Sequence, residues 1–156
     1  MLTAYEEIVR REIVTTRVFG APPALVFRVW TDPEQLQLWW GPHGFTNTFH
    51  HFDPRPGGIW RFTMHGPDGK NYVNEVEFVA IDELSRIVLE HVSQPRFRLT
   101  VLFEELGAGT KVTWRQLFET EAVRDAVSRF AVQGNEDNLD RLAAQIAQRS
   151  DAPHAI

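Results

Sequence analysis

The chain has 156 residues, a formal net charge of −5 at pH 7, and 43% hydrophobic residues. This length and hydrophobic content suit one folded domain with a buried core, and they exclude an intrinsically disordered chain. The chain contains no cysteine, which excludes disulfides and thiol chemistry, and it shows no basic patch of the kind a nucleic-acid partner would require.

Residues 1–12 are charged and lack the apolar run of a signal peptide. No apolar run in the chain approaches the ~20 residues that a membrane-spanning helix needs. We therefore expect a cytoplasmic protein without membrane insertion.

The first part of the sequence predicts a lead-in, a strand and two short helices. Residues 1–11 form the lead-in, and residues 12–19 are rich in β-branched side chains, which is typical of a strand. Pro22 and Pro23 suit the first turn of a helix, because the fixed φ of proline is compatible with that position. Asp32 can cap a second helix that ends before a Gly-Pro pair.

Alternation of apolar and polar residues then predicts six further strands, at residues 46–53, 59–65, 71–81, 86–92, 97–105 and 110–118. The loop at residues 66–70 suits a three-residue hairpin with Gly69 in the left-handed region. This hairpin places Arg61 opposite Glu75 on the solvent face, where opposite charges are favourable. Pairing across residues 93–95 places His91 opposite Phe97 on the inner face.

Thr120 can cap a long final helix over residues 121–148. Its apolar stripe comprises Val123, Val127, Phe130, Gly134, Leu139, Leu142 and Ile146. Glycine within a helix costs ~1 kcal/mol relative to alanine, so Gly134 indicates either a close approach of the backbone to the sheet or a ligand, or a neutral change. We expect residues 12–148 to form a single domain and residues 149–156 to form a C-terminal tail.

The inner face of the predicted sheet is apolar and aromatic with a few polar residues. Asn74, His91 and Gln116 are predicted to face inward, with Tyr72 beside them and Asn138 reaching the same space from the helix. An unpaired buried polar group costs ~1–3 kcal/mol, so these side chains either orient a polar group of a ligand or bond to one another or to water. His91 is the only titratable ring among them and is the candidate acid or base.

Two further groups of residues allow alternative interpretations. Trp39 and Trp40 end the second helix, where they either cover the mouth of a cavity or pack beneath the following loop. His50 and His51, with His43 and Asp53 nearby, suggest a metal site. Adjacent residues of a strand point to opposite faces, however, and no known zinc spacing is present. We therefore expect neither a metal nor a cofactor.

The order of elements predicts an α+β fold with a helix-grip arrangement. Four segments carry a more specific signal: APPALVFRVWTDPEQLQLWWGPHGF, DPRPGGIWRFTMHGPDG, FEELGAGTKVTW and GNEDNLDRL. They resemble the branch of the START-like, or SRPBCC, superfamily that is named after the activator of heat-shock-protein-90 ATPase. The resemblance covers about residues 12–148. It implies a curved antiparallel sheet of about seven strands, a long C-terminal helix across it, and a hydrophobic cavity between them that related families use to bind lipids, hormones or polyketides.

This resemblance favours a ligand pocket over an ordinary core. The residues expected to contact the ligand are Trp40, Trp60, Phe62, Met64, Tyr72, Asn74, Val76, His91, Phe97, Leu99, Val101, Trp114, Gln116, Phe130, Gly134 and Asn138. We expect the partner to be a small hydrophobic or aromatic molecule.

Three functions follow as hypotheses. The first is binding of that small molecule with no enzymatic activity or only a weak one. The second is a polyketide-cyclase-like or hydrolase-like enzyme, in which His91, Tyr72 or Asn74 polarises a carbonyl group. The third is a chaperone-associated interaction module, although we do not expect a chaperone partner because the namesake co-chaperone carries a further domain and a shared fold does not carry function. A homodimer is compatible with the sequence.

Overall fold

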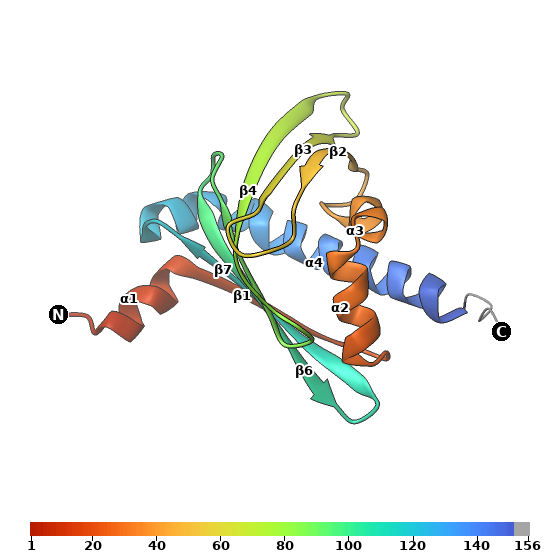
Figure 1. Cartoon of the computed structure of the whole chain (residues 1–156). Coiled ribbons are helices and arrows are strands. Elements are labelled where there is room, and N and C mark those ends of the chain that lie inside the picture. Colours follow the sequence, from red (N-terminus) through yellow and green to blue (C-terminus); the bar gives the residue numbers. More distant parts are fainter. Residues whose placement is uncertain (152–156) are drawn as a thin grey trace.

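A long helix crosses one face of a curved antiparallel sheet (Figure 1). This arrangement comes from a computed structural model, which describes residues 1–151. The strands are β1 (Glu12–Phe19), β2 (Thr46–Phe52), β3 (Ile59–His65), β4 (Asn71–Asp82), β5 (Arg86–His91), β6 (Phe97–Leu106) and β7 (Gly109–Phe118). The helices are α1 (Ala4–Arg11), α2 (Pro23–Thr31), α3 (Pro33–Trp39) and α4 (Glu121–Asp151).

The seven strands lie in the order β1-β7-β6-β5-β4-β3-β2. All neighbouring strands are antiparallel. Strand β1 pairs with β7, and each strand from β2 to β6 pairs with the next strand in sequence. Helices α2 and α3 connect β1 to β2 and pack against α4 beside the sheet. The predicted α+β helix-grip fold is confirmed.

The predicted strand registers are also confirmed. Arg61 lies opposite Glu75, and their side chains form an ion pair at 2.7 Å. His91 lies opposite Phe97 in the β5–β6 pair. In the hairpin between β3 and β4, Gly69 has φ of 83°, which is the left-handed conformation expected there. Alternation therefore assigns these side chains to the correct face of the sheet, while β2 and β4 each contain one register shift.

The helix termini follow the expected capping residues, except at the end of the chain. Asp32 accepts a hydrogen bond from the backbone N–H of Glu34 at 3.0 Å, and Thr120 accepts one from Val123 at 3.1 Å. The lead-in forms α1, where Thr3 provides a capping box. Helix α4 continues to Asp151, so residues 149–151 of the expected tail are helical. No glycine or proline intervenes to end the helix there, and residues 152–156 lie outside the described part of the chain.

Tryptophan side chains dominate the core beneath α2 and α3. Trp30, Trp39 and Trp60 are fully buried, and Trp39 Nε1 donates a hydrogen bond to Val29 O at 2.9 Å. Trp40 stacks on Trp114 with ring centroids 5.6 Å apart. Trp39 therefore packs in the core and does not cover a cavity mouth. Of the two tryptophans, only Trp40 lines a cavity.

No helix within residues 1–151 is both long enough and apolar enough to cross a bilayer.

Candidate ligand-binding site

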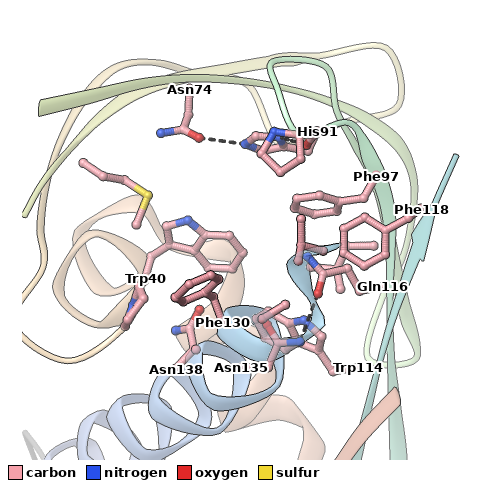
Figure 2. A pocket seen from close by; sticks show the side chains of 18 of the residues that line it. Trp40, Asn74, His91, Phe97, Trp114, Gln116, Phe118, Phe130, Asn135 and Asn138 are labelled. Carbon is pink, nitrogen blue, oxygen red and sulfur yellow. Dashed lines mark hydrogen bonds between the residues drawn. The ribbon is translucent and has the colours of Figure 1, made fainter. Parts of the chain in front are cut away.

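A cavity of about 380 Å³ lies between the inner face of the sheet and the first half of α4 (Figure 2). This volume falls within the range of small-molecule sites in proteins. Its apolar lining consists of Trp40, Pro42, Phe62, Met64, Pro95, Phe97, Leu99, Trp114, Phe118, Val127, Phe130 and Ala131. Its polar lining is confined to a few amide side chains and one histidine.

The cavity exists because α4 offers small side chains where it faces the sheet. Val127, Ala131 and Gly134 leave space that larger residues would fill, and Phe130 is 75% exposed. A Cβ added at Gly134 would meet only Pro42 Cγ at 3.8 Å, an ordinary van der Waals contact. A close approach of the backbone to the sheet, one explanation of this glycine, is therefore excluded.

One polar pair lies on the sheet side of the cavity, on β4 and β5. Asn74 and His91 are both buried, and Asn74 Oδ1 lies 2.7 Å from His91 Nε2. His91 Nδ1 lies 2.9 Å from the backbone oxygens of both Ser93 and Pro95. The imidazole also stacks on Phe97, with ring centroids 4.6 Å apart and planes only 2° from parallel. These contacts fix the ring in one orientation.

Burial lowers the pKa of His91 below its ordinary value of 6.5, because a charged ring loses its hydration there. The two backbone carbonyls act in the opposite direction, since they accept hydrogen bonds from the ring, but burial is the larger cause. The ring is therefore neutral near pH 7.

A second polar pair lies where α4 faces β7. Asn135 Nδ2 donates a hydrogen bond to Gln116 Oε1 at 3.0 Å. Asn138 is buried and donates through Nδ2 to Trp39 O at 2.9 Å, which ties α4 to the end of α3. Figure 2 shows these amides across the cavity from Asn74 and His91. A bound molecule would thus meet polar groups at both ends and apolar walls between them.

Most residues expected to contact a ligand line the cavity, and four do not. Those on the lining are Trp40, Phe62, Met64, Asn74, His91, Phe97, Leu99, Trp114, Gln116, Phe130, Gly134 and Asn138. Trp60, Val76 and Val101 face inward but are fully buried in the core, where Trp60 packs against Trp40. Tyr72 is 44% exposed and contacts Phe45, since it lies near the hairpin tip beyond the reach of α4.

The cavity lining also includes residues outside the set expected to contact a ligand. They are Gly41, Pro42, Pro95, Phe118, Val127, Ala131 and Asn135. Asn135 could have been predicted as a lining residue from the sequence, because it lies three residues before Asn138 and residues at this spacing share one face of a helix. The positions of the loop residues Gly41 and Pro42 on the lining could not be predicted from a local pattern, since they depend on a tertiary contact.

That contact is made by Arg141 of α4. Its Nη1 donates to the backbone oxygens of Trp40, Gly41 and Pro42, each at 3.0 Å, and its Nη2 donates to Leu38 O at 2.9 Å. One guanidinium group therefore holds the turn that follows α3. This turn forms part of the cavity wall.

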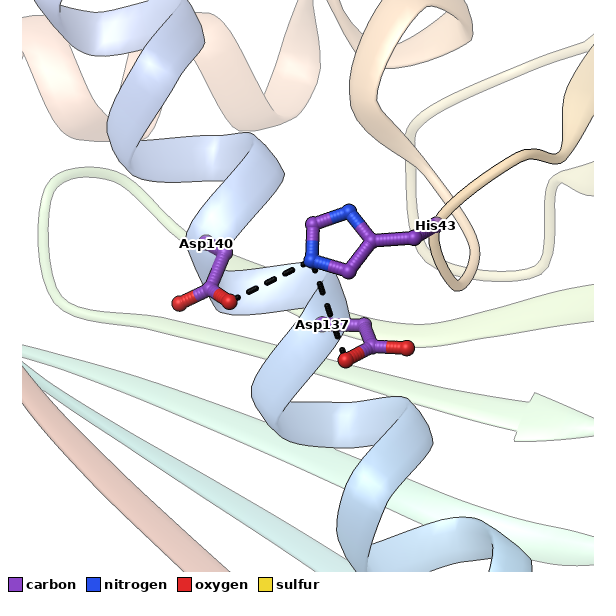
Figure 3. Close-up of side chains that lie close together, drawn as sticks. All are labelled: His43, Asp137 and Asp140. Carbon is purple, nitrogen blue, oxygen red and sulfur yellow. Dashed lines mark hydrogen bonds and ion pairs between the residues drawn. The ribbon is translucent and has the colours of Figure 1, made fainter.

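The histidines considered for a metal site are not brought together. His50 bonds to Thr63 Oγ1 at 2.8 Å, and Asp53 pairs with Arg55 at 2.8 Å. His43 instead lies beside Asp137 and Asp140, with possible ligand atoms within 4.8 Å of one another (Figure 3).

The carboxylates beside His43 already have partners. Asp140 Oδ1 accepts from Arg17 at 2.7 Å, and Asp137 Oδ1 accepts from Gln133 at 2.8 Å. Hydrogen bonds from Arg17 and then His43 lower the pKa of Asp140. This cluster is a polar network between α4, β1 and the loop after α3.

Solved structures of other proteins share this architecture. No curated protein matches the sequence. A solved structure from Nitrosomonas europaea has a TM-score of 0.84 at 20% identity, covering 92% of this chain and 98% of its own. One from Arthrobacter aurescens has a TM-score of 0.83 at 22% identity, covering 96% of each chain.

A third structure, from Silicibacter pomeroyi, is described as an AHSA1 protein. Its TM-score is 0.74 at 18% identity, covering 88% of this chain and 99% of its own. At these identities the likeness concerns the fold alone. The profile of the family described as Activator of Hsp90 ATPase homolog 1-like protein matches residues 20–147. That range includes α2, all the strands from β2 to β7 and nearly all of α4. The chain therefore belongs to the Activator of Hsp90 ATPase homolog 1-like family.

Proposed function

We propose that this protein binds a small hydrophobic or aromatic molecule in the cavity between the sheet and α4. The observation that carries the proposal is the cavity itself, which measures about 380 Å³ and has a mainly aromatic and aliphatic lining. Protein interiors are normally close-packed, and empty apolar space forgoes favourable contacts. A ligand that fills this space would restore those contacts.

The arrangement of the lining suits a flat molecule with polar groups at its ends. Trp40 and Trp114 form a stacked pair on one wall, and Phe97 lies beside His91 on the sheet. Aromatic surfaces of this kind contribute binding energy through burial and ring stacking. The polar pairs fix the orientation of the molecule, as the few polar groups of apolar pockets commonly do.

Native mass spectrometry of protein purified from its host without denaturation tests the proposal directly. A retained small-molecule mass is the expected result, and it would give the chemical class of the ligand. In parallel, a naphthalene carboxamide serves as a neutral aromatic probe. Its binding is expected to quench the emission of Trp40 and Trp114, because both indoles line the cavity.

A matched pair of variants places the probe within the cavity. Ala131→Leu adds a side chain on the lining, whereas Ala126→Leu adds the same side chain at an exposed position of the same helix. We expect Ala131→Leu to weaken probe binding about tenfold or more, a loss of ~1.4 kcal/mol, and Ala126→Leu to leave it unchanged. Equal binding in both variants, or a probe that does not bind the parent protein, would contradict the proposal.

The enzymatic hypothesis depends on His91, and its surroundings favour binding over catalysis. Both ring nitrogens lie within hydrogen-bond distance of protein oxygens, namely those of Ser93, Pro95 and Asn74. Among the described residues, the lining offers no second titratable group and no hydroxyl or thiol nucleophile that could act with the ring. His91 is therefore suited to recognition of a ligand.

A further inference from the structure

The oxygens around His91 require more protons than a neutral ring carries. Ser93 O and Pro95 O lie 2.9 Å from Nδ1, and Asn74 Oδ1 lies 2.7 Å from Nε2. A neutral imidazole has one N–H donor and one acceptor nitrogen. A proton on Nδ1 leaves the lone pair of Nε2 facing Asn74, and a proton on Nε2 leaves the lone pair of Nδ1 facing both carbonyls. Only the imidazolium donates to all three oxygens.

Rotation of the Asn74 amide does not remove this mismatch. Its Nδ2 now donates to Tyr72 O at 2.9 Å. Exchanging the two ends of the amide would offer Nδ2 to His91 but would set Oδ1 against Tyr72 O, so one unfavourable oxygen contact would replace another. Ser93 Oγ, at 3.5 Å from Nε2, is too distant to donate a strong hydrogen bond.

No protein carboxylate in the described residues balances a charge on His91. From β4, Glu75 and Glu77 project on the opposite face of the sheet. From β5 and β6, Glu90 and Arg98 pair with each other on that same face.

The remaining neighbours of His91 are equally unable to balance its charge. Arg96, in the turn beyond His91, is exposed. From α4, the residues that face the cavity are uncharged: Val127, Phe130, Ala131, Gly134, Asn135 and Asn138. Among the described residues, His91 is thus the single titratable group on the lining, and its protonated form requires an anion from elsewhere.

We infer that the cavity selects aromatic or aliphatic carboxylic acids, and that His91 takes up a proton from solvent when such an acid binds. This inference rests on the proposed function, since it names the ligand class of the same cavity. The carboxylate would replace Asn74 Oδ1 as the acceptor at Nε2 and would supply the missing negative charge. Charge-assisted hydrogen bonds of this kind are about twice as strong as neutral ones. No covalent bond forms in the process.

The test compares a naphthalene carboxylic acid with the carboxamide of the same shape. Affinities are measured by tryptophan quenching between about pH 5.5 and 8, the range in which an imidazole changes its charge. At the acidic end we expect the acid to bind about tenfold more tightly than the amide. This advantage should shrink as the pH rises, while the affinity of the amide stays constant. Calorimetry in two buffers of different ionisation enthalpy should show uptake of about one proton with the acid and none with the amide.

Two substitutions identify the group that takes up the proton. His91→Gln is expected to abolish both the advantage of the acid and the proton uptake. The matched control His50→Gln removes an exposed histidine that bonds only to Thr63 in this structure, and it should change neither quantity. Proton uptake that persists in His91→Gln would mean that the acid binds in its neutral form, and this would overturn the inference.

Asn74→Asp provides a second route if His91→Gln does not fold. It places a carboxylate beside Nε2, so the protein itself would supply the anion. His91 should then be protonated without ligand, which the ring ¹⁵N chemical shifts report, and the acid should lose its advantage over the amide. An acid that still binds more tightly than the amide in this variant would contradict the inference.

The outcomes separate this inference from the proposed function. Equal affinities of the acid and the amide for the parent protein would overturn the inference alone, because the cavity would still bind an aromatic molecule. If neither compound binds, the proposed function fails and the inference fails with it.

Discussion

The two halves of α4 differ in what lies beneath them, although they form one continuous helix. None of the residues 121–135 is buried, and this half spans the cavity. In residues 136–151, Leu139, Leu142 and Ile146 are buried against the core that contains the tryptophans. The helix is therefore anchored by its second half and extends from there over the cavity.

This difference shows how a small domain can keep an open cavity and remain folded. The anchored half supplies the apolar burial, and Arg141 and Asn138 add hydrogen bonds to the backbone oxygens at the end of α3. The other half has no buried residue, and Asn135 there donates a hydrogen bond to Gln116. The second half of the helix thus contributes most of the stability, and the first half lines the proposed binding site. Substitutions in the two halves should therefore have different effects on stability and on binding.

The largest effect is expected for truncation in the anchored half. Leu142→Ala removes a fully buried side chain and should lower the free energy of unfolding by about 2–5 kcal/mol, as large-to-small substitutions in cores do. Val127→Ala, on the cavity, should cost less than ~1 kcal/mol, because part of its surface already faces open space. Urea denaturation of the two variants measures the difference. Similar losses would show that the two halves are equally anchored.

A smaller loss is expected when the guanidinium of Arg141 is removed. Arg141→Met keeps the apolar stem but removes the guanidinium donor from the backbone oxygens of Leu38, Trp40, Gly41 and Pro42. Trp40 O and Pro42 O still accept from Asn47 Nδ2 and from the N–H of Phe45. Hydrogen bonds to charged groups contribute ~1.5–3 kcal/mol, so we expect destabilisation of that order. Arg129→Met, at an exposed position over the cavity half, is the control and should be neutral within ~0.5 kcal/mol. Hydrogen exchange of residues 40–45 should accelerate only in Arg141→Met, and unchanged protection there would disprove the role of this contact.

The sheet was predictable because its signal is local. Alternation with period two and the hairpin at residues 66–70 give the register of Arg61 with Glu75 and of His91 with Phe97 without any knowledge of tertiary structure. The inward position of Asn74, His91 and Gln116 follows from the same alternation. Facing inward, however, does not distinguish a cavity wall from a packed core.

The cavity lining was less predictable, because it depends on which inward side chains have a neighbour above them. Trp60 and Val101 face the same side as Phe62 and Leu99, yet they are buried in the core and do not line the cavity, and Trp60 packs against Trp40. The wall formed by Gly41 and Pro42 depends on Arg141, about a hundred residues later in the chain. No local pattern in the sequence contains that contact.

A stabilising change is expected at the centre of α4. Gly134→Ala adds a Cβ that meets only Pro42 Cγ at 3.8 Å, so it gains helix propensity without a clash. We expect an increase of up to ~1 kcal/mol in stability, which corresponds to about 2–4 °C in melting temperature for a chain of this size. Gly57→Ala is the contrasting control, because Gly57 has φ of 84° and alanine would be strained there. Destabilisation by Gly134→Ala would reveal that the helix backbone itself must remain bare at the cavity.

The smallest effect concerns the pH dependence of stability in the cavity half. Burial lowers the pKa of His91 in the folded protein below 6.5, so just below pH 6.5 the unfolded chain binds a proton that the folded chain does not. Stability should therefore fall as the pH decreases through 6.5, whereas above that pH His91 has no influence on it. His91→Gln should show a shallower decrease, and melting temperatures of both proteins between about pH 8 and 5.5 measure the difference. The two proteins differ only at residue 91, so all other groups contribute equally to both melting profiles.

A bound carboxylic acid should act in the opposite direction to burial. It favours the charged ring in the folded state, so the parent protein should be stabilised more strongly at the acidic end of this range than at the alkaline end. The carboxamide should stabilise equally at all pH values, and neither compound should alter the cost of Leu142→Ala, since that side chain lies in the anchored half. If the acid and the amide raise the melting temperature with the same pH profile, then His91 orders the cavity wall without responding to what fills it.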